Sequence, residues 1–99
     1  MGTKNDPGKF DCYANVEPDE PMFVLLARDR LAGHLVSLWS KMRYGDVEAA
    51  TAVFKSMLSK HAEHYATNPD VPKAEEAMDC SLAMFRWRHD NRTPGEGVN

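Results

Sequence analysis

Apolar residues recur at three- and four-residue spacing through most of the chain after residue 29, and this spacing predicts amphipathic helices. The first predicted helix covers roughly residues 30 to 44, with Asp29 as its cap and Gly45 placed to end it. The second predicted helix begins after a capping Asp46 and ends before Asn68 and the proline that follows.

A third helix is predicted after Asp70, which can cap it, with Pro72 in its first turn, where a missing backbone N–H costs nothing. The stripe of the first helix is Leu31, Leu35, Leu38, Trp39 and Met42, and that of the second is Val47, Ala50, Val53, Phe54, Met57, Leu58, Ala62 and Tyr65. The third helix has Ala74, Ala77, Met78, Ser81, Leu82 and Phe85 along one face. A second row, Cys80, Met84 and Trp87, widens the apolar surface of the third helix. Because the connections between helices are short, we expect a three-helix antiparallel core.

The segment before these helices has a different pattern. Residues 10 to 16 alternate between apolar and polar side chains, which is typical of a half-buried strand. Residues 22 to 27 form a continuous apolar run, which favours a strand buried on both faces. A hairpin across residues 17 to 21 would pair the two, and an unpaired edge would invite another subunit. The alternative is a helix that starts at Pro21 and continues into the next segment. The predicted fold class is therefore mainly α, with a short N-terminal extended or β element.

The ends of the chain are polar and contain glycine and proline. Residues 1 to 9 and 91 to 99 are expected to be flexible tails around a single helical domain at residues 10 to 90. A chain of 99 residues has room for one modest core. Apolar surface left outside so small a core favours self-association, so we expect a homo-oligomer.

Charge and cysteine content narrow the functional classes. The 12 basic and 15 acidic residues give a net charge of -3, which provides no general attraction for nucleic acid. The two cysteines, Cys12 and Cys80, lie far apart, and no secretory signal is recognised at the N-terminus. We therefore expect reduced thiols, a cytoplasmic location and no membrane span.

Candidate catalytic and metal-binding groups are sparse. His61 and His64 are one helical turn apart, but the sequence lacks the HExxH and Cys-x-x-Cys patterns that would support a metal site. Cys80 lies on an apolar helix face, where a thiol behaves as a small hydrophobe. No glycine-rich phosphate loop is present. We expect no catalytic residue, no cofactor and no bound metal.

The candidate binding residues lie in three places. Arg86, Trp87 and Arg88 belong to a stretch in which arginines and aromatics alternate, a composition that stacks on bases and contacts phosphates. The structural alternative is that the aromatics anchor the last helix while the arginines complement its C-terminal dipole. Asp19 and Glu20 lie in an acidic loop that could present negative charge to a partner.

Arg28 is the third candidate binding site. It follows the apolar run directly and precedes Asp29 and the first predicted helix, so it could contact an anionic ligand or a partner. The simpler interpretation is an ion pair with Asp29 or with an acid of the preceding loop.

Several segments resemble a known group of proteins. The most specific is Pro18-Asp19-Glu20-Pro21 followed by Phe23-Val24-Leu25-Leu26-Ala27-Arg28-Asp29; weaker ones are Tyr13-Ala14, Val36-Ser37-Leu38-Trp39, Glu76-Ala77, Cys80, Ala83-Met84 and Trp87-Arg88. Over roughly residues 10 to 88 the chain resembles a family of small uncharacterised proteins encoded by phages and prophages. The resemblance implies a small accessory protein made inside a bacterial host, and it transfers no catalytic residues.

These observations together predict a non-enzymatic protein that binds a host protein or complex and inhibits a defence or nucleic-acid-processing system. The alternative is an oligomeric small-ligand or nucleotide-binding protein that uses Arg28, Arg86, Arg88 and Trp87. A third and weaker interpretation is a zinc-assisted enzyme built around His61 and His64.

Overall fold

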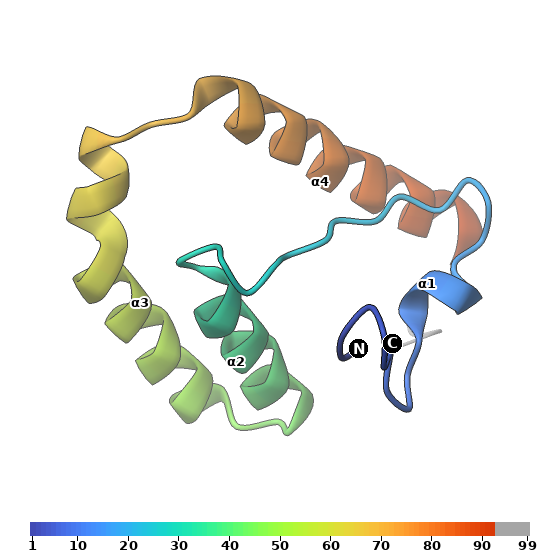
Figure 1. Cartoon of the computed structure of the whole chain (residues 1–99), viewed down its shortest axis with the longest axis horizontal. Coiled ribbons are helices and arrows are strands. Elements are labelled where there is room, and N and C mark those ends of the chain that lie inside the picture. The colour runs from blue at the N-terminus through green and yellow to red at the C-terminus, as the bar shows by residue number, and fades with distance from the viewer. Residues whose placement is uncertain (93–99) are drawn as a thin grey trace. The chain divides into compact units, whose positions relative to one another are not determined.

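A computed structural model describes residues 1–92 of the chain. It contains four helices: α1 (Cys12–Asn15), α2 (Ala32–Arg43), α3 (Val47–Thr67) and α4 (Val71–Asn91) (Figure 1). No strand is present within the described range. The prediction of a mainly helical fold is confirmed.

The turn between α2 and α3 forms through local chemistry. Asp46 N–H donates to Lys41 O at 3.0 Å and Gly45 N–H donates to Met42 O at 3.0 Å, which is the Schellman arrangement that satisfies the last carbonyls of a helix. Gly45 has a φ of 79°, a left-handed conformation that costs glycine little. Asp46 Oδ1 then accepts a 2.9 Å hydrogen bond from Ala49 N–H and caps α3. The predicted stop at Gly45 and the predicted cap at Asp46 are both confirmed.

The start of α4 also follows the sequence signal. Asp70 Oδ1 accepts a hydrogen bond of 3.2 Å from Lys73 N–H. The helix begins at Val71, so Pro72 lies in the first turn, where backbone N–H groups have no partner within the helix. The capping role predicted for Asp70 is confirmed.

The start of α2 differs from the prediction that Asp29 caps it. Leu31 occupies the N-cap position and makes no side-chain capping bond. Asp29 Oδ1 instead accepts from Leu31 N–H at 2.8 Å, two residues on, and Asp29 O accepts from Ala32 N–H at 3.1 Å. These bonds hold a turn, and the turn delays the helix to Ala32. The predicted cap at Asp29 was wrong because an aspartate can serve a turn as readily as a helix end.

The strand predicted at residues 10 to 16 was also wrong, because this segment contains α1. Asp11 Oδ1 accepts from Ala14 N–H at 3.2 Å, and Asn15 Nδ2 donates to Asp11 O at 2.7 Å. Local side-chain bonds therefore support one helical turn in place of extended backbone. Phe10 is 61% exposed, and Cys12 and Ala14 are exposed as well, so the expected buried face is not formed.

The apolar run at residues 22 to 27 forms neither of the two expected elements. Residues 21 to 26 have no helical or strand hydrogen bonding, and a turn begins at Ala27. Asp29 N–H donates to Leu26 O at 2.9 Å across that turn. Without a neighbouring strand, a run of this kind has no ladder to join.

The chain divides into two compact units. The first consists of Met1–Phe23 and Glu76–Asn99, and the second is Val24–Glu75. Residues 1 to 9 belong to the first unit and are exposed. The expectation of one domain at residues 10 to 90 stays a prediction, and the predicted C-terminal tail lies outside the described residues from residue 93 onward.

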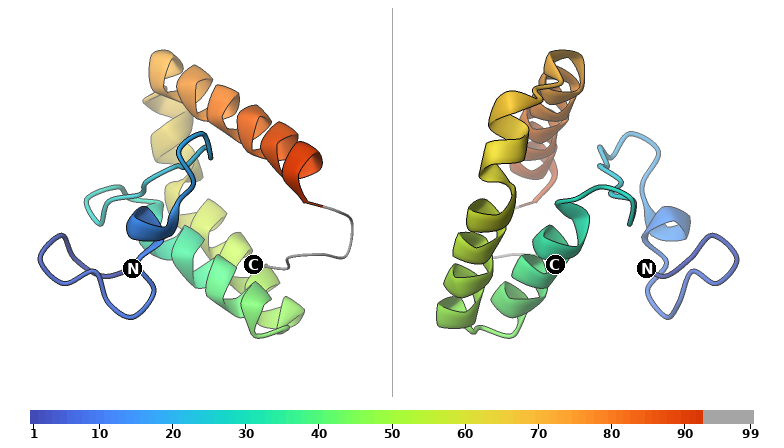
Figure 2. Two further views of the ribbon diagram at one scale, coloured as in Figure 1. Left: turned by 90° about the vertical axis from the view of Figure 1, so that its right-hand side faces the viewer. Right: turned by 60° about the vertical axis from the view of Figure 1, so that its left-hand side comes forward.

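In the second unit, α2 and α3 lie side by side, and the chain reverses direction between them (Figure 2). The buried apolar residues are Ala32 on α2 and Ala50 and Met57 on α3. Ala50 and Met57 are two helical turns apart and therefore face the same way. Small side chains at this contact allow the helices to approach closely.

Much of the predicted apolar surface is exposed. Phe54 and Leu58 on α3 are 41% and 47% exposed, although they belong to the predicted core stripe. The other exposed large apolar residues on α2 and α4 are Val36, Trp39, Met42, Val71, Met78, Leu82, Met84 and Phe85. The spacing identified the apolar faces correctly as parts of helices, but the structure covers only part of each face.

Candidate functional site

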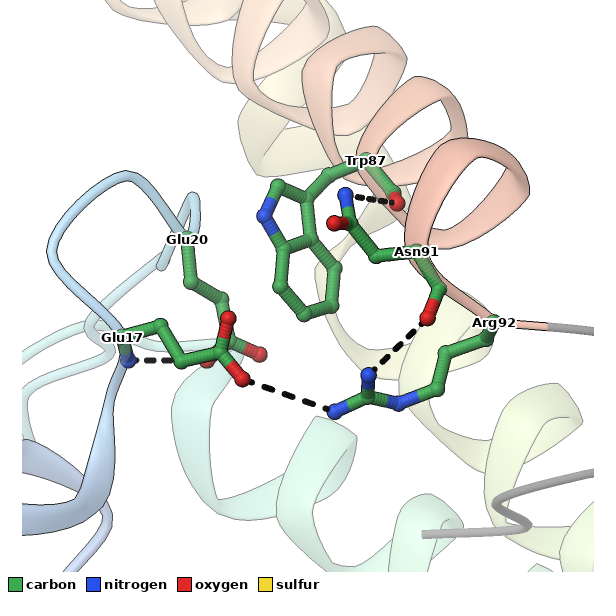
Figure 3. Close-up of polar contacts among 5 residues, drawn as sticks. All are labelled: Glu17, Glu20, Trp87, Asn91 and Arg92. Carbon is green, nitrogen blue, oxygen red and sulfur yellow. Dashed lines mark hydrogen bonds and ion pairs between the residues drawn. The ribbon is translucent and has the colours of Figure 1, made fainter.

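The first unit brings the acidic loop to the C-terminal end of α4 (Figure 3). Glu17 Oε1 lies 3.8 Å from Arg92 Nη2. The guanidinium of Arg92 also lies over the indole of Trp87, with its central carbon 5.1 Å from the ring centroid. One arginine therefore contacts both an acid of the loop and an aromatic ring of the helix. We call Glu17, Glu20, Trp87, Asn91 and Arg92 the loop–helix cluster.

The acidic loop is held in shape by two reciprocal bonds. Glu17 N–H donates to Glu20 Oε1 at 3.1 Å, and Glu20 N–H donates to Glu17 O at 3.0 Å. The second bond closes a four-residue turn, and the first uses the Glu20 carboxylate to satisfy a backbone donor. As a result, Glu20 is half-buried and engaged within its own loop, whereas Asp19 is exposed.

The end of α4 is satisfied by its own side chains. Asn91 Nδ2 donates to Trp87 O at 2.9 Å, and Arg92 Nη1 donates to Asn91 O at 3.0 Å. These donors meet carbonyls at the negative end of the helix dipole, where a cation is also favourable. The arrangement agrees with the structural alternative for the arginine-rich stretch, in which cations complement the helix end.

A second contact joins the N-terminal segment to α4. Cys80 Sγ donates a 3.4 Å hydrogen bond to Met22 O. Cys80 is half-buried and its thiol is free. Cys80 and Trp87 are two turns apart, so they lie on one face of α4, and this face contacts residues of the N-terminal segment.

The predicted binding residues are only partly brought together. Glu20 and Trp87 lie in the loop–helix cluster, and Asp19 lies on the same loop. Arg86 and Arg88 are exposed on α4. Arg28 belongs to the second unit, on the turn before α2.

Glu17 belongs to the predicted acidic loop and Arg92 to the predicted arginine-rich stretch, but neither was singled out as a binding residue and their contact was not predicted. The sequence feature that could have identified Arg92 is its position in the same aromatic and arginine-rich stretch as Trp87. The signal for Glu17 was its charge in the acidic loop. No spacing rule links two residues so far apart in sequence, so their contact needed the tertiary structure.

The second unit contains a pair of histidines between its two helices. His34 Nε2 on α2 lies 3.1 Å from His61 Nε2 on α3, and the ring centroids are 5.0 Å apart with an interplanar angle of 60°. Both rings are half-buried. This contact was not predicted, because helical spacing relates His61 to His64 and does not relate it to a residue on another helix. The ring of His64 instead makes an edge-to-face contact with Tyr65, at 5.1 Å between centroids.

The environment of His61 disfavours its charged form. The pKa of His61 is lowered from the ordinary value of 6.5, first because burial penalises the imidazolium ion and then because nearby basic groups disfavour a further positive charge. These groups are, in decreasing order of effect, His34, Arg30, Lys60 and His64. His61 Nδ1 is buried and has no hydrogen-bond partner among the described residues. An unpartnered nitrogen is less costly as a bare lone pair than as an N–H, so this environment favours a neutral ring that donates through Nε2 to His34.

The described part of the chain holds no larger set of metal-binding side chains. No cluster of three or more His, Cys, Asp or Glu side chains suited to a metal ion occurs between residues 1 and 92. None of the helices in that range combines the length and the hydropathy needed to cross a bilayer.

Comparison with known proteins identifies no relative: no family model, no curated protein and no solved structure matches this chain. The function is therefore inferred from the residues and their geometry.

Proposed function

We propose that this protein is a non-enzymatic binding protein that docks on another protein through α4. The observation that carries the proposal is an exposed apolar stripe formed by Met78, Leu82 and Phe85, which are 59%, 55% and 71% exposed. Their spacing of four and then three residues places them on one face of the helix. We call these three residues the α4 stripe.

The α4 stripe lies opposite the face that contacts the N-terminal segment. At about 100° per residue, Cys80 and Trp87 project to the other side of the helix from Leu82. One face of α4 is therefore used within the first unit, and the other presents large apolar side chains to solvent. Anchors at such spacing are how an amphipathic helix enters a hydrophobic groove.

The energetic gain from such docking is substantial. Full burial of a large apolar side chain contributes about 1.5–3 kcal/mol, so three partly exposed anchors supply several kcal/mol before the entropy of association is subtracted. A groove that accepts the stripe would also exclude water from the flanking α4 surface, including Arg86. Arginine at the edge of an apolar interface adds orientation and specificity.

We propose a bacterial host protein as the partner, with binding in the host cytoplasm. The phage-type origin expected from the PDEP-to-LLARD segment is itself part of the proposal. The support from the chain is its acidic net charge, which suits a protein partner better than nucleic acid. Inhibition of a host defence or nucleic-acid-processing complex by occupying its surface is part of the proposal. The antiparallel three-helix arrangement and the homo-oligomer expected from the sequence are kept as further parts of it.

Affinity capture with matched variants tests this proposal. Leu82→Asp places a charge in the α4 stripe, and Val36→Asp makes the same change at an exposed residue of α2 whose exposure, 57%, is close to the 55% of Leu82. We expect wild type and Val36→Asp to retain one partner from bacterial lysate and Leu82→Asp to lose it. Circular dichroism verifies that both variants remain helical.

Light scattering of the purified chain separates a host partner from a second copy of this protein. Specific capture that Leu82→Asp abolishes, with an oligomer mass that Leu82→Asp leaves unchanged, supports both the host partner and the homo-oligomer. A stable dimer that Leu82→Asp dissociates, with no captured host protein, would show that the stripe serves self-association alone and would overturn the choice of partner.

A further inference from the structure

His34 Nε2 on α2 and His61 Nε2 on α3 lie 3.1 Å apart. We propose that these two histidines form a binding site for a divalent transition-metal ion such as Zn²⁺, Ni²⁺ or Cu²⁺. The ion would join α2 to α3. We call this pair the two-histidine site.

The separation of the two nitrogens suits one shared ion. A zinc ion binds each histidine nitrogen at about 2.0–2.1 Å, so two nitrogens 3.1 Å apart subtend roughly 100° at the ion. This value lies between the right angle of an octahedral site and the wider angle of a tetrahedral site. Only small ring movements are needed for either geometry.

The ring geometry departs from that of a straight hydrogen bond. A straight N–H···N bond of this length would place the ring centroids about 5.4 Å apart, taking each nitrogen as roughly 1.1–1.2 Å from its ring centre. The centroids are 5.0 Å apart and the rings are inclined by 60°, so the two rings do not point directly at each other. Rings aimed at one ion would have centroids about 4.8 Å apart with the metal–nitrogen distances given above.

The chemistry of the donors defines the class of ion. Imidazole nitrogen suits zinc, copper and nickel, whereas magnesium and calcium prefer oxygen ligands. Because no third metal-binding side chain joins the pair within residues 1–92, water would complete the coordination. Binding at Nε2 would move the His61 proton to Nδ1, which is buried without a hydrogen-bond partner among the described residues, and the nearby Arg30 and Lys60 oppose a cation. We therefore expect modest affinity and a stoichiometry of one ion per chain.

The site has a structural consequence. His34 and His61 are 27 positions apart in the chain, on the two helices that pack together in the second unit. An ion held by both would stabilise the packed form, because the unfolded chain does not hold the two rings together.

Metal titration of the full chain tests the two-histidine site. ZnCl₂ is added to wild type, His34→Gln, His61→Gln and a control double variant, His64→Gln/His89→Gln, with MgCl₂ as the control ion. We expect zinc, but not magnesium, to raise the melting temperature of wild type and of the double variant. Calorimetry should show that either single substitution weakens zinc binding at least about tenfold.

Imidazole ¹⁵N NMR of the unmodified chain provides a readout that does not depend on variants folding. Zinc should shift the resonances of His34 and His61 and leave those of His64 and His89 in place. The proposal is overturned by the absence of any zinc response in wild type, by an unchanged response in His34→Gln, or by zinc shifts at His64 and His89 alone. A Co²⁺ spectrum with a thiolate charge-transfer band would assign the ion to Cys12 or Cys80 and would also overturn it.

Discussion

The guanidinium of Arg92 lies over the indole ring of Trp87, with 5.1 Å between the guanidinium carbon and the ring centroid. The same guanidinium lies 3.8 Å from Glu17. A cation that contacts both a ring and a carboxylate links the end of α4 to the acidic loop. The side chains of Arg92 and Glu17 are 39% and 57% exposed, so solvent screens their attraction.

Truncation of Arg92 and truncation of Trp87 should lower the stability of the protein by unequal amounts. Arg92→Ala removes an exposed cation–π contact and ion pair, and we expect a loss of about 0.5–1 kcal/mol. Trp87→Ala removes a half-buried aromatic surface, and we expect a larger loss of about 2 kcal/mol. Urea denaturation followed by far-UV circular dichroism measures both. Arg86→Ala, on the same helix, should change stability by less than about 0.5 kcal/mol. Equal losses for Arg86 and Arg92 would contradict the role given to the cluster.

Two glycines should respond to alanine in opposite directions. Gly45 has a φ of 79° and open space around it, so an added methyl group would not clash but would strain the backbone. We expect Gly45→Ala to destabilise the protein by about 1 kcal/mol. Gly33 lies inside α2, with no atom within 4 Å of an added Cβ, so Gly33→Ala should stabilise by about 0.5–1 kcal/mol. Thermal or urea unfolding of the two variants compares them, and effects of the same sign would contradict this account.

The cap of α3 should contribute measurably to stability. Asp46→Ala removes the acceptor for Ala49 N–H and leaves that donor without a side-chain partner. The expected loss is about 1 kcal/mol. Asp46→Asn keeps an oxygen in place and serves as the matched control, with most of the stability retained. A cap that contributes nothing would give the same midpoint of denaturation for both variants.

Acid should destabilise the protein through His61. The pKa of its ring is lowered in the folded chain and is about 6.5 in the unfolded chain, so between these two values the unfolded chain binds more protons. Stability therefore rises with pH through that interval, and the full contribution is present above about pH 6.5. As the pH falls below about 6.5, the folded state loses stability until the folded ring itself titrates.

The pH experiment compares wild type with His61→Gln and His64→Gln in the presence of a chelator. Urea denaturation at a series of pH values should show a shallower acid dependence in His61→Gln than in wild type. His64→Gln should keep most of the wild-type slope. Parallel curves for wild type and His61→Gln would contradict the lowered pKa.

The sequence by itself determined the helices whose ends are set by local chemistry. Asp46 and Asp70 cap because an aspartate oxygen reaches a backbone N–H three residues on, and Gly45 ends α2 because glycine tolerates a positive φ. These signals act over a few residues, so no distant partner is needed to interpret them. The predicted helix cap at Asp29 and the predicted strand at residues 10 to 16 were wrong for a related reason. A short polar side chain can stabilise a turn, a helix end or an extended segment.

Only the tertiary structure decided which residues far apart in the chain meet. It joined His34 to His61 and Glu17 to Arg92, and no local pattern encodes either contact. It also decided which apolar residues are covered: Ala50 and Met57 are buried, whereas Leu58 and the α4 stripe are exposed. Helical spacing shows that a face is apolar, but burial depends on the surface that packs against that face, and this surface comes from another part of the chain or from a partner.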